Sequence, residues 1–150
     1  MRARTIYLIK RAEVASRALL ETELKDLDLT PSQYATLSML ALHPETSSSD
    51  LARRVLVTPQ SMSEMIMALS RKGLIKRQES DGNRRVLDIS LSAAGRALLE
   101  KAEARVDALE AKLFAVLGPD ELQALRSHLE RVLADESKRR GKSSLAPRSA

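Results

Sequence analysis

The sequence predicts a mainly α-helical protein with a small β-hairpin in its middle. Apolar residues recur at intervals of three and four along most of the 150 residues, which is the spacing of an amphipathic helix. After Gly73 the apolar period changes to two, over two short runs separated by turn residues, as in a hairpin. The length corresponds to about one domain.

Two helices are expected at the start of the chain. Apolar rows at helical spacing place the first helix at about residues 5–27. Thr30 is an N-cap residue followed by a proline, which is favoured at the first helical position, and Pro44 ends the segment that follows. These signals place the second helix over residues 31–42.

The next two helices are expected to follow each other closely. A short third helix begins near Ser49 or Asp50, and Thr58 with Pro59 opens a fourth helix that ends at Gly73. A short helix joined to a second one by three or four residues is a helix-turn-helix, in which the second helix lies in the major groove of DNA.

The hairpin is expected directly after these helices, with strands at residues 74–79 and 85–91 and turn chemistry in Ser80–Asn83. A hairpin in this place makes the fold a winged helix. Its turn is followed by Arg84 and Arg85, and arginine enters a narrow, strongly negative minor groove at a lower desolvation cost than lysine.

Two long helices complete the prediction, at residues 92–117, capped by Ser92, and at residues 120–137, after the break at Gly118-Pro119. Residues 137–150 carry five Lys and Arg and too few apolar residues to fold, so a disordered basic tail is expected. The other basic segment is residues 50–91, with eight Lys and Arg against five Asp and Glu, which favours a polyanionic partner.

Composition excludes several classes of function. The chain contains no cysteine, which excludes a disulfide scaffold, a thiolate metal site and a cysteine nucleophile. It has no glycine-rich phosphate loop, no histidine pair at metal spacing and no serine in an elbow context, so no enzyme activity, metal or cofactor is expected. No apolar run approaches the roughly 18 residues of a membrane span, so no membrane partner and a cytoplasmic, nucleoid-associated location are expected.

From about residue 5 to residue 136 the chain resembles the MarR family of bacterial transcriptional regulators. The segments that carry the resemblance are Leu51-Ala52-Arg53-Arg54, Val57-Thr58-Pro59 through Leu69, Lys72-Gly73-Leu74-Ile75, and Asn83-Arg84-Arg85 followed by Ser90-Leu91-Ser92-Ala93-Ala94-Gly95. The resemblance implies one domain over residues 1–136, with a winged helix-turn-helix at about residues 31–91. It also implies a homodimer held by the helices at residues 5–27, 92–117 and 120–137.

The expected function is therefore sequence-specific binding of double-stranded DNA by a transcriptional regulator, as a repressor on a pseudo-palindromic operator. The expected DNA-binding residues are Ser48, Ser49, Thr58, Pro59, Gln60, Ser61, Ser63, Glu64, Arg71, Arg77, Arg84 and Arg85. The alternative is a winged-helix module for protein interaction or nonspecific DNA architecture, without response to an effector.

Regulators of this kind often release DNA when a small aromatic or phenolic anion binds between the dimer helices and the winged domain. The residues expected by position to line such a site are Tyr7, Lys10, Arg11 and Tyr34. Since there is no cysteine, the remaining possibilities are ligand sensing, methionine oxidation or no effector. Of the three methionines Met62, Met65 and Met67, those that face inward are expected to fill the core.

Three residues depart from the family pattern. Asn83 replaces an aspartate that pairs with the wing arginine, and Glu64 stands where a neutral or basic residue is common. Glu64 is expected to accept from a cytosine amino group or to pair with a nearby arginine. Leu56 occupies a turn position that is often glycine, but such a turn can be built without a positive φ angle, so the leucine excludes neither the fold nor the function.

Overall fold

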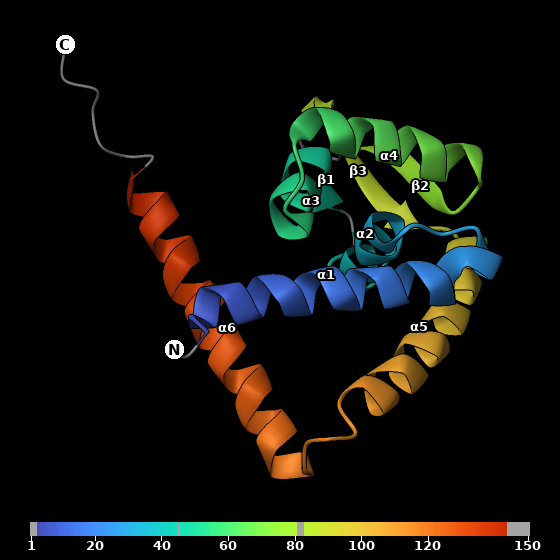
Figure 1. Ribbon diagram of the computed structural model, residues 1–150. Helices are drawn as coiled ribbons and strands as arrows, with labels where there is room; N and C mark the ends of the chain where they lie inside the picture. The colour runs from blue at the N-terminus through green and yellow to red at the C-terminus, as the bar shows by residue number, and fades with distance from the viewer. Residues whose placement is uncertain (1–2, 45, 81–82, 144–150) are drawn as a thin grey trace. The chain divides into compact units, whose positions relative to one another are not determined.

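The computed structural model describes residues 3–44, 46–80 and 83–143, and the side chains of these except residues 79–87 and 137–143. The chain divides into two compact units, Met1–Leu109 and Glu110–Ala150, which are described separately. Figure 1 labels the helices and strands. Their bounds are α1 Thr5–Leu24, α2 Pro31–Leu42, β1 Thr46–Ser47, α3 Ser48–Val55, α4 Pro59–Arg71, β2 Ile75–Ser80, β3 Asn83–Leu91, α5 Ala93–Leu113 and α6 Pro119–Ser143.

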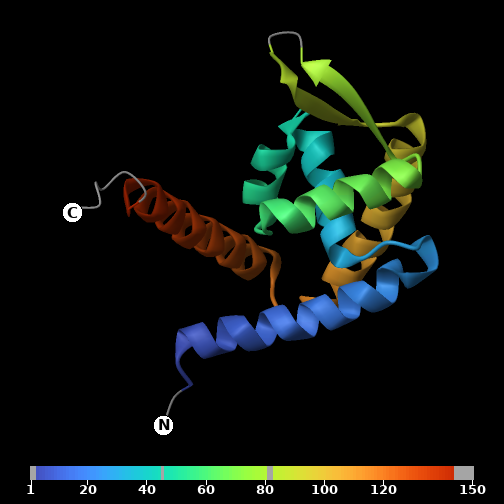
Figure 2. The ribbon, with the colours of Figure 1, turned by 90° about the horizontal axis from the view of Figure 1, so that it is seen from above.

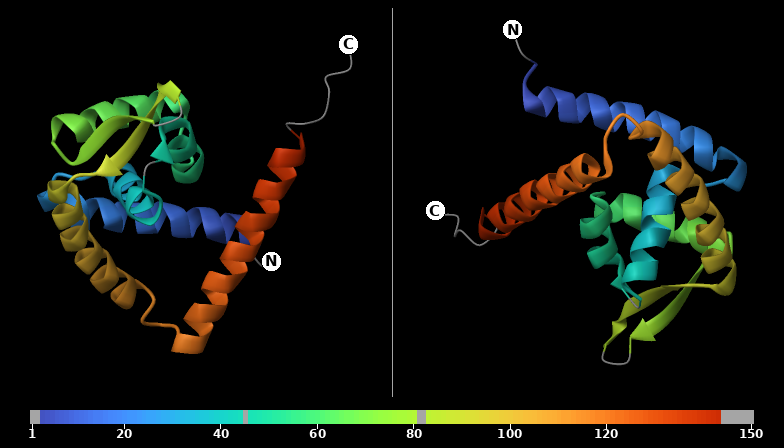
Figure 3. Two further views of the ribbon diagram at one scale, coloured as in Figure 1. Left: turned by 180° about the vertical axis from the view of Figure 1, so that it is seen from behind. Right: turned by 90° about the horizontal axis from the view of Figure 1, so that it is seen from below.

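The first unit contains the predicted hairpin, built from β2 and β3. The two strands are antiparallel, with Ile75 opposite Leu91 and Arg77 opposite Ile89. Figure 2 and the right-hand view of Figure 3 show this hairpin extending past the helices of the first unit. The mainly helical, winged fold class is therefore confirmed.

A third strand, β1, was not predicted. Thr46 and Ser47 pair with Ile89 and Asp88, so the sheet order is β1-β3-β2. Two residues are too few to show an alternating pattern, so the sequence carries no periodic signal for this strand. The strand holds the start of α3 against the wing.

The core of the first unit consists of buried side chains from several helices and one strand, packed around α4. The fully or almost fully buried large apolar side chains are Leu24, Leu37, Leu40, Leu51, Met62, Leu69 and Ile89. They come from α1, α2, α3, α4 and β3. Each such side chain contributes about 1.5–3 kcal/mol of burial, which fixes the orientation of α4 about its axis.

Helix α1 reaches this core through its last turn. Beyond Leu24 the chain makes a 3-10 turn, Lys25–Leu27, and leaves it at Asp28 with a φ angle of 52°. Lys72, at the C-cap of α4, lies 2.8 Å from the Asp28 carboxylate. Arg105 of α5 donates to the carbonyl oxygen of Glu23 over 3.0 Å. The end of α1 is thus tied to both α4 and α5.

Several helix starts agree with their local signals. Thr30 forms a capping box with Gln33 at the start of α2, and the Thr58 side chain accepts from the backbone N–H of Ser61 at the start of α4. Ser92 accepts from the N–H of Gly95 and donates to the carbonyl oxygen of Gly73. The cap of α5 therefore also binds it to the end of α4.

Other helix bounds differ from expectation. Helix α3 starts at Ser48, one residue early, because Ser47 accepts from the N–H of Asp50 and acts as the cap. Helix α5 ends at Leu113 rather than at residue 117. The chain forms a turn there, in which the N–H of Leu117 donates to the carbonyl oxygen of Phe114. Helix α6 continues to Ser143, past the expected end at residue 137, because its lysines and arginines are good helix formers. The expectation of a disordered tail is therefore wrong for residues 138–143, and residues 144–150 lie outside the described residues.

The turn between α3 and α4 contains a positive φ angle, although its residue is a leucine. Leu56 adopts the left-handed conformation, with φ 60° and ψ 43°, and its N–H donates to the carbonyl oxygen of Ala52. The left-handed residue ends α3 and reverses the chain, which is the usual task of a glycine at this position. The Leu56 side chain is 81% exposed.

The second unit contains the end of α5 and all of α6. Glu110 accepts from Arg126 over 2.7 Å, which joins the two helices within this unit. Helix α6 leaves a row of apolar side chains exposed in the single chain: Leu125, Leu129, Val132 and Leu133.

Candidate nucleic-acid interface

Helix α4 has one face in the core and one face in solvent. Met62, Ile66 and Leu69 are buried on the inner face. All the α4 residues predicted to bind DNA lie on the exposed face: Pro59, Gln60, Ser61, Ser63, Glu64 and Arg71. The burial of one face holds the other in a fixed direction, as a helix that inserts into a groove requires.

The hydroxyl groups at the start of α4 are organised by the helix cap. The Thr58 hydroxyl donates to the Ser61 hydroxyl over 2.9 Å and accepts from the Ser61 N–H over 3.1 Å. The Ser63 hydroxyl donates to the carbonyl oxygen of Pro59 over 2.9 Å. The Ser63 oxygen therefore faces solvent mainly as an acceptor, which suits an exocyclic amino group of a base.

Gln60 and Glu64 form a pair one helical turn apart. The Gln60 amide nitrogen donates to a Glu64 carboxylate oxygen over 3.4 Å. A carboxylate only accepts, so this contact directs the amide nitrogen toward Glu64 and leaves the Gln60 carbonyl oxygen outward. Among the described residues, the partner of Glu64 is this glutamine and not an arginine.

The start of α3 presents the predicted residues Ser48 and Ser49, half-buried and exposed respectively. The cap itself is Ser47, whose hydroxyl donates to the Asp50 carboxylate over 2.7 Å. This hydrogen bond has the largest effect on the pKa of Asp50 and a hydrogen bond from Arg53 the next largest, and both hold that pKa below its ordinary value of 3.8. Ser47 was missed because three consecutive serines leave the choice of cap open.

Two exposed cations on α3 were absent from the predicted set. Arg53 contacts Asp50, and an Arg54 guanidinium nitrogen lies 3.0 Å from the Nε2 of His43. Arginine near the C-terminus of a helix is expected from the helix dipole alone, so these two side chains carry no separate signal for DNA binding in the sequence.

The wing places Arg77 on β2, exposed and opposite Ile89 of β3. Lys76 is also exposed on this strand. Arg84 and Arg85 belong to β3, but their side chains lie outside the described residues, as does the side chain of Asn83. The predicted minor-groove contact of Arg85 therefore stays a prediction.

Of the residues predicted to bind an effector, three lie on the first turns of α1 and are exposed: Tyr7, Lys10 and Arg11. The Arg11 guanidinium lies 5.9 Å from the centre of the Tyr7 ring. Lys10 binds Glu13 over 3.0 Å, and hydrogen bonds from Arg17 and Lys10 lower the pKa of Glu13. Tyr34 lies on α2, half-buried against the core.

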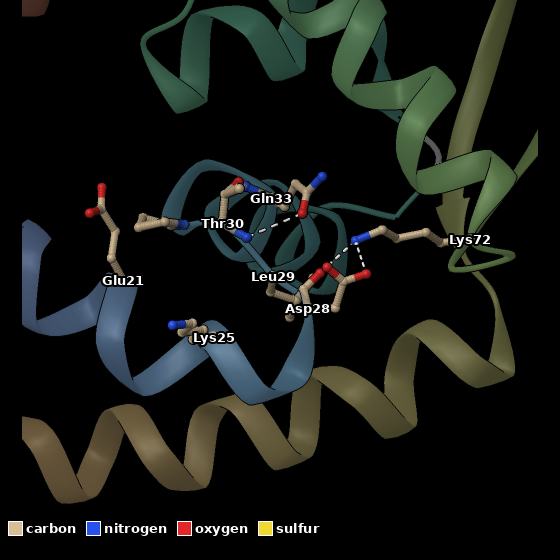
Figure 4. Close-up of a pocket in the computed structure, with 8 residues that line it drawn as sticks. Glu21, Lys25, Asp28, Leu29, Thr30, Gln33 and Lys72 are labelled. Atoms are coloured by element: carbon tan, nitrogen blue, oxygen red, sulfur yellow. Dashed lines mark hydrogen bonds and ion pairs between the residues drawn. The ribbon is translucent and has the colours of Figure 1, made fainter.

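A hollow of about 410 Å³ lies at the other end of α1. Its lining residues are Glu21, Lys25, Asp28, Leu29, Thr30, Pro31, Gln33 and Lys72. Figure 4 shows the Lys72 ammonium beside Asp28, and the Gln33 side chain bonded to the N–H of Thr30. The free N–H groups at the start of α2 are bonded within its own capping box. The lining carries equal numbers of positive and negative side chains.

Within the described ranges, no three His, Asp or Glu side chains are placed to share a metal ion. No helix in the described part of the chain combines the length and the apolar character needed to cross a bilayer.

The comparisons with known proteins agree with this geometry. A family model described as MarR family matches residues 29–87, the region of the helix-turn-helix and the wing. The HTH-type transcriptional repressor Rv2887 of Mycobacterium tuberculosis is 35% identical over 129 residues, which cover 86% of this chain and 93% of that protein.

Solved structures extend the agreement to the fold. A transcriptional repressor, CouR, bound to a 23-mer DNA duplex is 28% identical with a TM-score of 0.81, over 87% of this chain and 92% of that one. A probable transcriptional regulator from Pseudomonas aeruginosa is 28% identical with a TM-score of 0.77, over 86% and 96% of the two chains. The crystal structure of MarR shares the fold at 22% identity and a TM-score of 0.83, over 93% and 95%. This chain belongs to the MarR family.

Proposed function

We propose that this chain is a transcriptional repressor that binds a pseudo-palindromic DNA operator as a homodimer. The observation that carries the proposal is helix α4, whose buried side fixes its direction and whose exposed side is polar. The names of the relatives support it, since one is a transcriptional repressor and another is a repressor bound to duplex DNA.

Charge around α4 supports a polyanionic partner. Five exposed cations lie on α3, on the end of α4 and on β2: Arg53, Arg54, Arg71, Lys76 and Arg77. Each cation that neutralises a phosphate releases condensed counterions, which supplies affinity that is independent of sequence. Ser48 and Ser49, at the start of α3, are proposed to contact phosphate.

Sequence selection is assigned to the start of α4 and minor-groove contact to the wing. Gln60 presents its carbonyl oxygen outward, and its amide pairs well with the edge of adenine. The other base-contacting side chains proposed are Thr58, Pro59, Ser61, Ser63 and Glu64. In the wing, Arg77, Arg84 and Arg85 are proposed to approach the minor groove.

The homodimer is proposed from apolar surface that one copy leaves exposed. On α1 the exposed side chains include Ile6, at 77%, and Val14, at 54%. The row of α6 described above is exposed as well. A second copy related by a two-fold axis would cover such rows and place two α4 helices about 34–36 Å apart, in successive major grooves.

The predicted domain division is proposed on the same grounds: dimerisation helices at both ends and a winged helix-turn-helix at about residues 31–91. An effector site at Tyr7, Lys10, Arg11 and Tyr34, for a small aromatic or phenolic anion, belongs to the proposal as well. A regulator of a bacterial chromosome would act in the cytoplasm, at the nucleoid.

Selection of bound duplexes from a random DNA pool tests the proposal. We expect an enriched sequence with two inverted half-sites whose centres lie about one helical turn apart. The dissociation constant for that duplex should rise steeply with salt. No enrichment, together with a monomeric mass in solution, would refute the proposal. If no sequence is enriched but the protein binds all duplexes in a salt-dependent way, the result would instead support the nonspecific architectural module.

A further inference from the structure

Helix α4 concentrates the oxidisable side chains of this protein. Three of the five methionines, Met62, Met65 and Met67, lie on it, and the chain has no cysteine. Thioethers are therefore the side chains of this chain that a hydroperoxide oxidises most readily. The packing of the first unit gives the three sulfur atoms different surroundings.

Two of these methionines are shielded. Met62 is fully buried. Met65 is half-buried, and its Sδ lies 2.8 Å from the hydroxyl oxygen of Thr36, which is itself fully buried on α2. The hydroxyl group occupies one side of the Met65 sulfur, so an oxidant has little access to it.

Met67 is different, because it is 47% exposed. It follows Glu64 by three residues and precedes Arg71 by four, so the three side chains share one face of the helix. This is the exposed face on which Gln60 also lies. Met67 is thus the accessible thioether of α4, on the side proposed to meet DNA.

We propose that Met67 is an oxidation site through which hydroperoxides weaken DNA binding. The inference rests on the proposed function. The sulfur lone pair attacks one oxygen of hydrogen peroxide, and the O–O bond breaks. The leaving hydroxide then takes the proton from the oxygen that is now bound to sulfur, and forms water. The thioether becomes a sulfoxide, oxidised by two electrons, and the peroxide is reduced by two.

The sulfoxide changes how this face meets DNA. A thioether is apolar and suits contact with a thymine methyl group. A sulfoxide oxygen only accepts hydrogen bonds, while phosphates and most major-groove base atoms are also acceptors. Glu64, one turn away, adds a negative charge. Docking then buries a polar group without a donor, which costs affinity.

The experiment uses the full chain and the duplex obtained by selection. Hydrogen peroxide is added until peptide mapping shows one oxygen atom on Met67, and the dissociation constant is measured by fluorescence anisotropy before and after treatment. The readout is the ratio of the two constants. We expect a ratio of about ten for the unmodified sequence. Reduction by methionine sulfoxide reductases should restore the initial value.

Two variants provide the controls. In Met67→Leu the ratio should fall to about one, whereas in Met39→Leu, which removes a half-buried methionine of α2, it should stay near ten. Circular dichroism checks that each variant is folded.

Complete oxidation of Met67 with an unchanged dissociation constant would overturn the inference. An equal loss of affinity in Met67→Leu would overturn it too, because another residue would then carry the effect. In both cases the untreated protein still binds the duplex, so the proposed function stands. Failure of the untreated protein to bind any duplex would refute the proposed function, and the inference with it.

Discussion

Gly95, in the first turn of α5, lies directly against the backbone of Leu74, the residue before β2. A Cβ atom on Gly95 would be 2.0 Å from the carbonyl oxygen of Leu74. The same carbonyl oxygen accepts from the N–H of Ser92 over 3.0 Å. The start of α5 and the start of the wing are thus in contact at the level of the main chain, which leaves no room for any side chain.

Replacing Gly95 by alanine should therefore destabilise the protein. The methyl group would push apart two pieces of backbone, and overpacking of this kind costs about 1–3 kcal/mol or more. The better helix propensity of alanine returns about 1 kcal/mol. The contact is with backbone atoms, which cannot move aside as a flexible side chain can, so the upper end of this cost applies, about 3 kcal/mol. We expect a net loss of about 2 kcal/mol in the free energy of unfolding, measured by urea denaturation.

The matched control is Gly118→Ala, at the break between α5 and α6. The nearest atom to a Cβ there is a Glu121 carboxylate oxygen at 3.5 Å, an ordinary contact. This variant should unfold within about 0.5 kcal/mol of the unmodified sequence. Equal losses at the two glycines would contradict the assignment of the Gly95 effect to the Leu74 contact.

Leu56→Gly should stabilise the protein. A left-handed backbone costs an L-residue about 1–2 kcal/mol, and the exposed Leu56 side chain recovers little by burial. Glycine offsets about 0.4–1 kcal/mol of this gain, because it raises the conformational entropy of the unfolded chain. The net gain in unfolding free energy should be about 0.5–1 kcal/mol, visible as a higher midpoint in urea.

Leu42→Gly offers the comparison. Leu42 is also exposed, at 68%, but it is the last residue of α2 and helical. Glycine should destabilise the fold there, by up to about 1 kcal/mol. A gain at both positions, or at neither, would mean that the left-handed angle of Leu56 is not the cause.

The carboxyl group of Asp50 should titrate below pH 3.8. Hydrogen bonds from Ser47 and then Arg53 favour its ionised form in the folded chain. Because the folded pKa is the lower one, ionised Asp50 stabilises the fold above the unfolded pKa, and this contribution is lost as the pH falls through the folded pKa. The carboxyl carbon shift in an NMR titration measures the midpoint.

Ser47→Ala should move that midpoint up toward 3.8, since the largest cause of the shift is removed. Ser49→Ala, two residues later, leaves the bond from Ser47 in place and should not change it. An unchanged midpoint in Ser47→Ala would show that the hydroxyl group does not hold the carboxylate.

Features that depend on a few neighbouring residues could be predicted from the sequence, whereas features that depend on tertiary packing could not. Thr30, Thr58 and Ser92 are correctly predicted as helix caps, because a cap depends on a few neighbouring residues. The left-handed Leu56 depends on how α3 and α4 pack, so its own residue type does not reveal the positive φ angle. The shielding of Met65 likewise depends on Thr36, which lies far away in the sequence.

The candidate site was predictable for a similar reason. Pro59, Gln60, Ser63 and Glu64 fall on the exposed face once the apolar period of α4 is recognised. The pairing of Gln60 with Glu64 was not foreseen, since spacing shows which side chains are neighbours but not which groups bond.

Gln60→Ala and Arg85→Ala should affect DNA binding in different ways. Loss of a base contact should reduce discrimination at one operator position by about 1–3 kcal/mol. Loss of a wing cation should weaken binding to every duplex and reduce the salt slope by about one. To distinguish these two effects, dissociation constants are measured for the selected duplex and for a scrambled one, at several salt concentrations. Uniform loss from both changes would contradict the division of roles.

Deletion of residues 137–150 should weaken binding to all duplexes without breaking the dimer. The deletion removes five cations and no acidic residue, whereas the exposed apolar row of α6, which ends at Leu133, remains. Each of these cations that meets a phosphate contributes about 0.9 to the salt slope, so the slope should fall measurably. Light scattering reports the mass of the particle in the same samples.

Charge and helix length are separated by a second variant of full length, in which the same five cations are replaced by glutamine. Helix α6 ends at Ser143, so the deletion shortens it while the glutamine variant keeps its length. Equal losses of salt slope in the two proteins assign the effect to charge. A monomeric deletion variant beside a dimeric glutamine variant would instead show that the last turns of α6 hold the two copies together, because only the deletion removes their backbone.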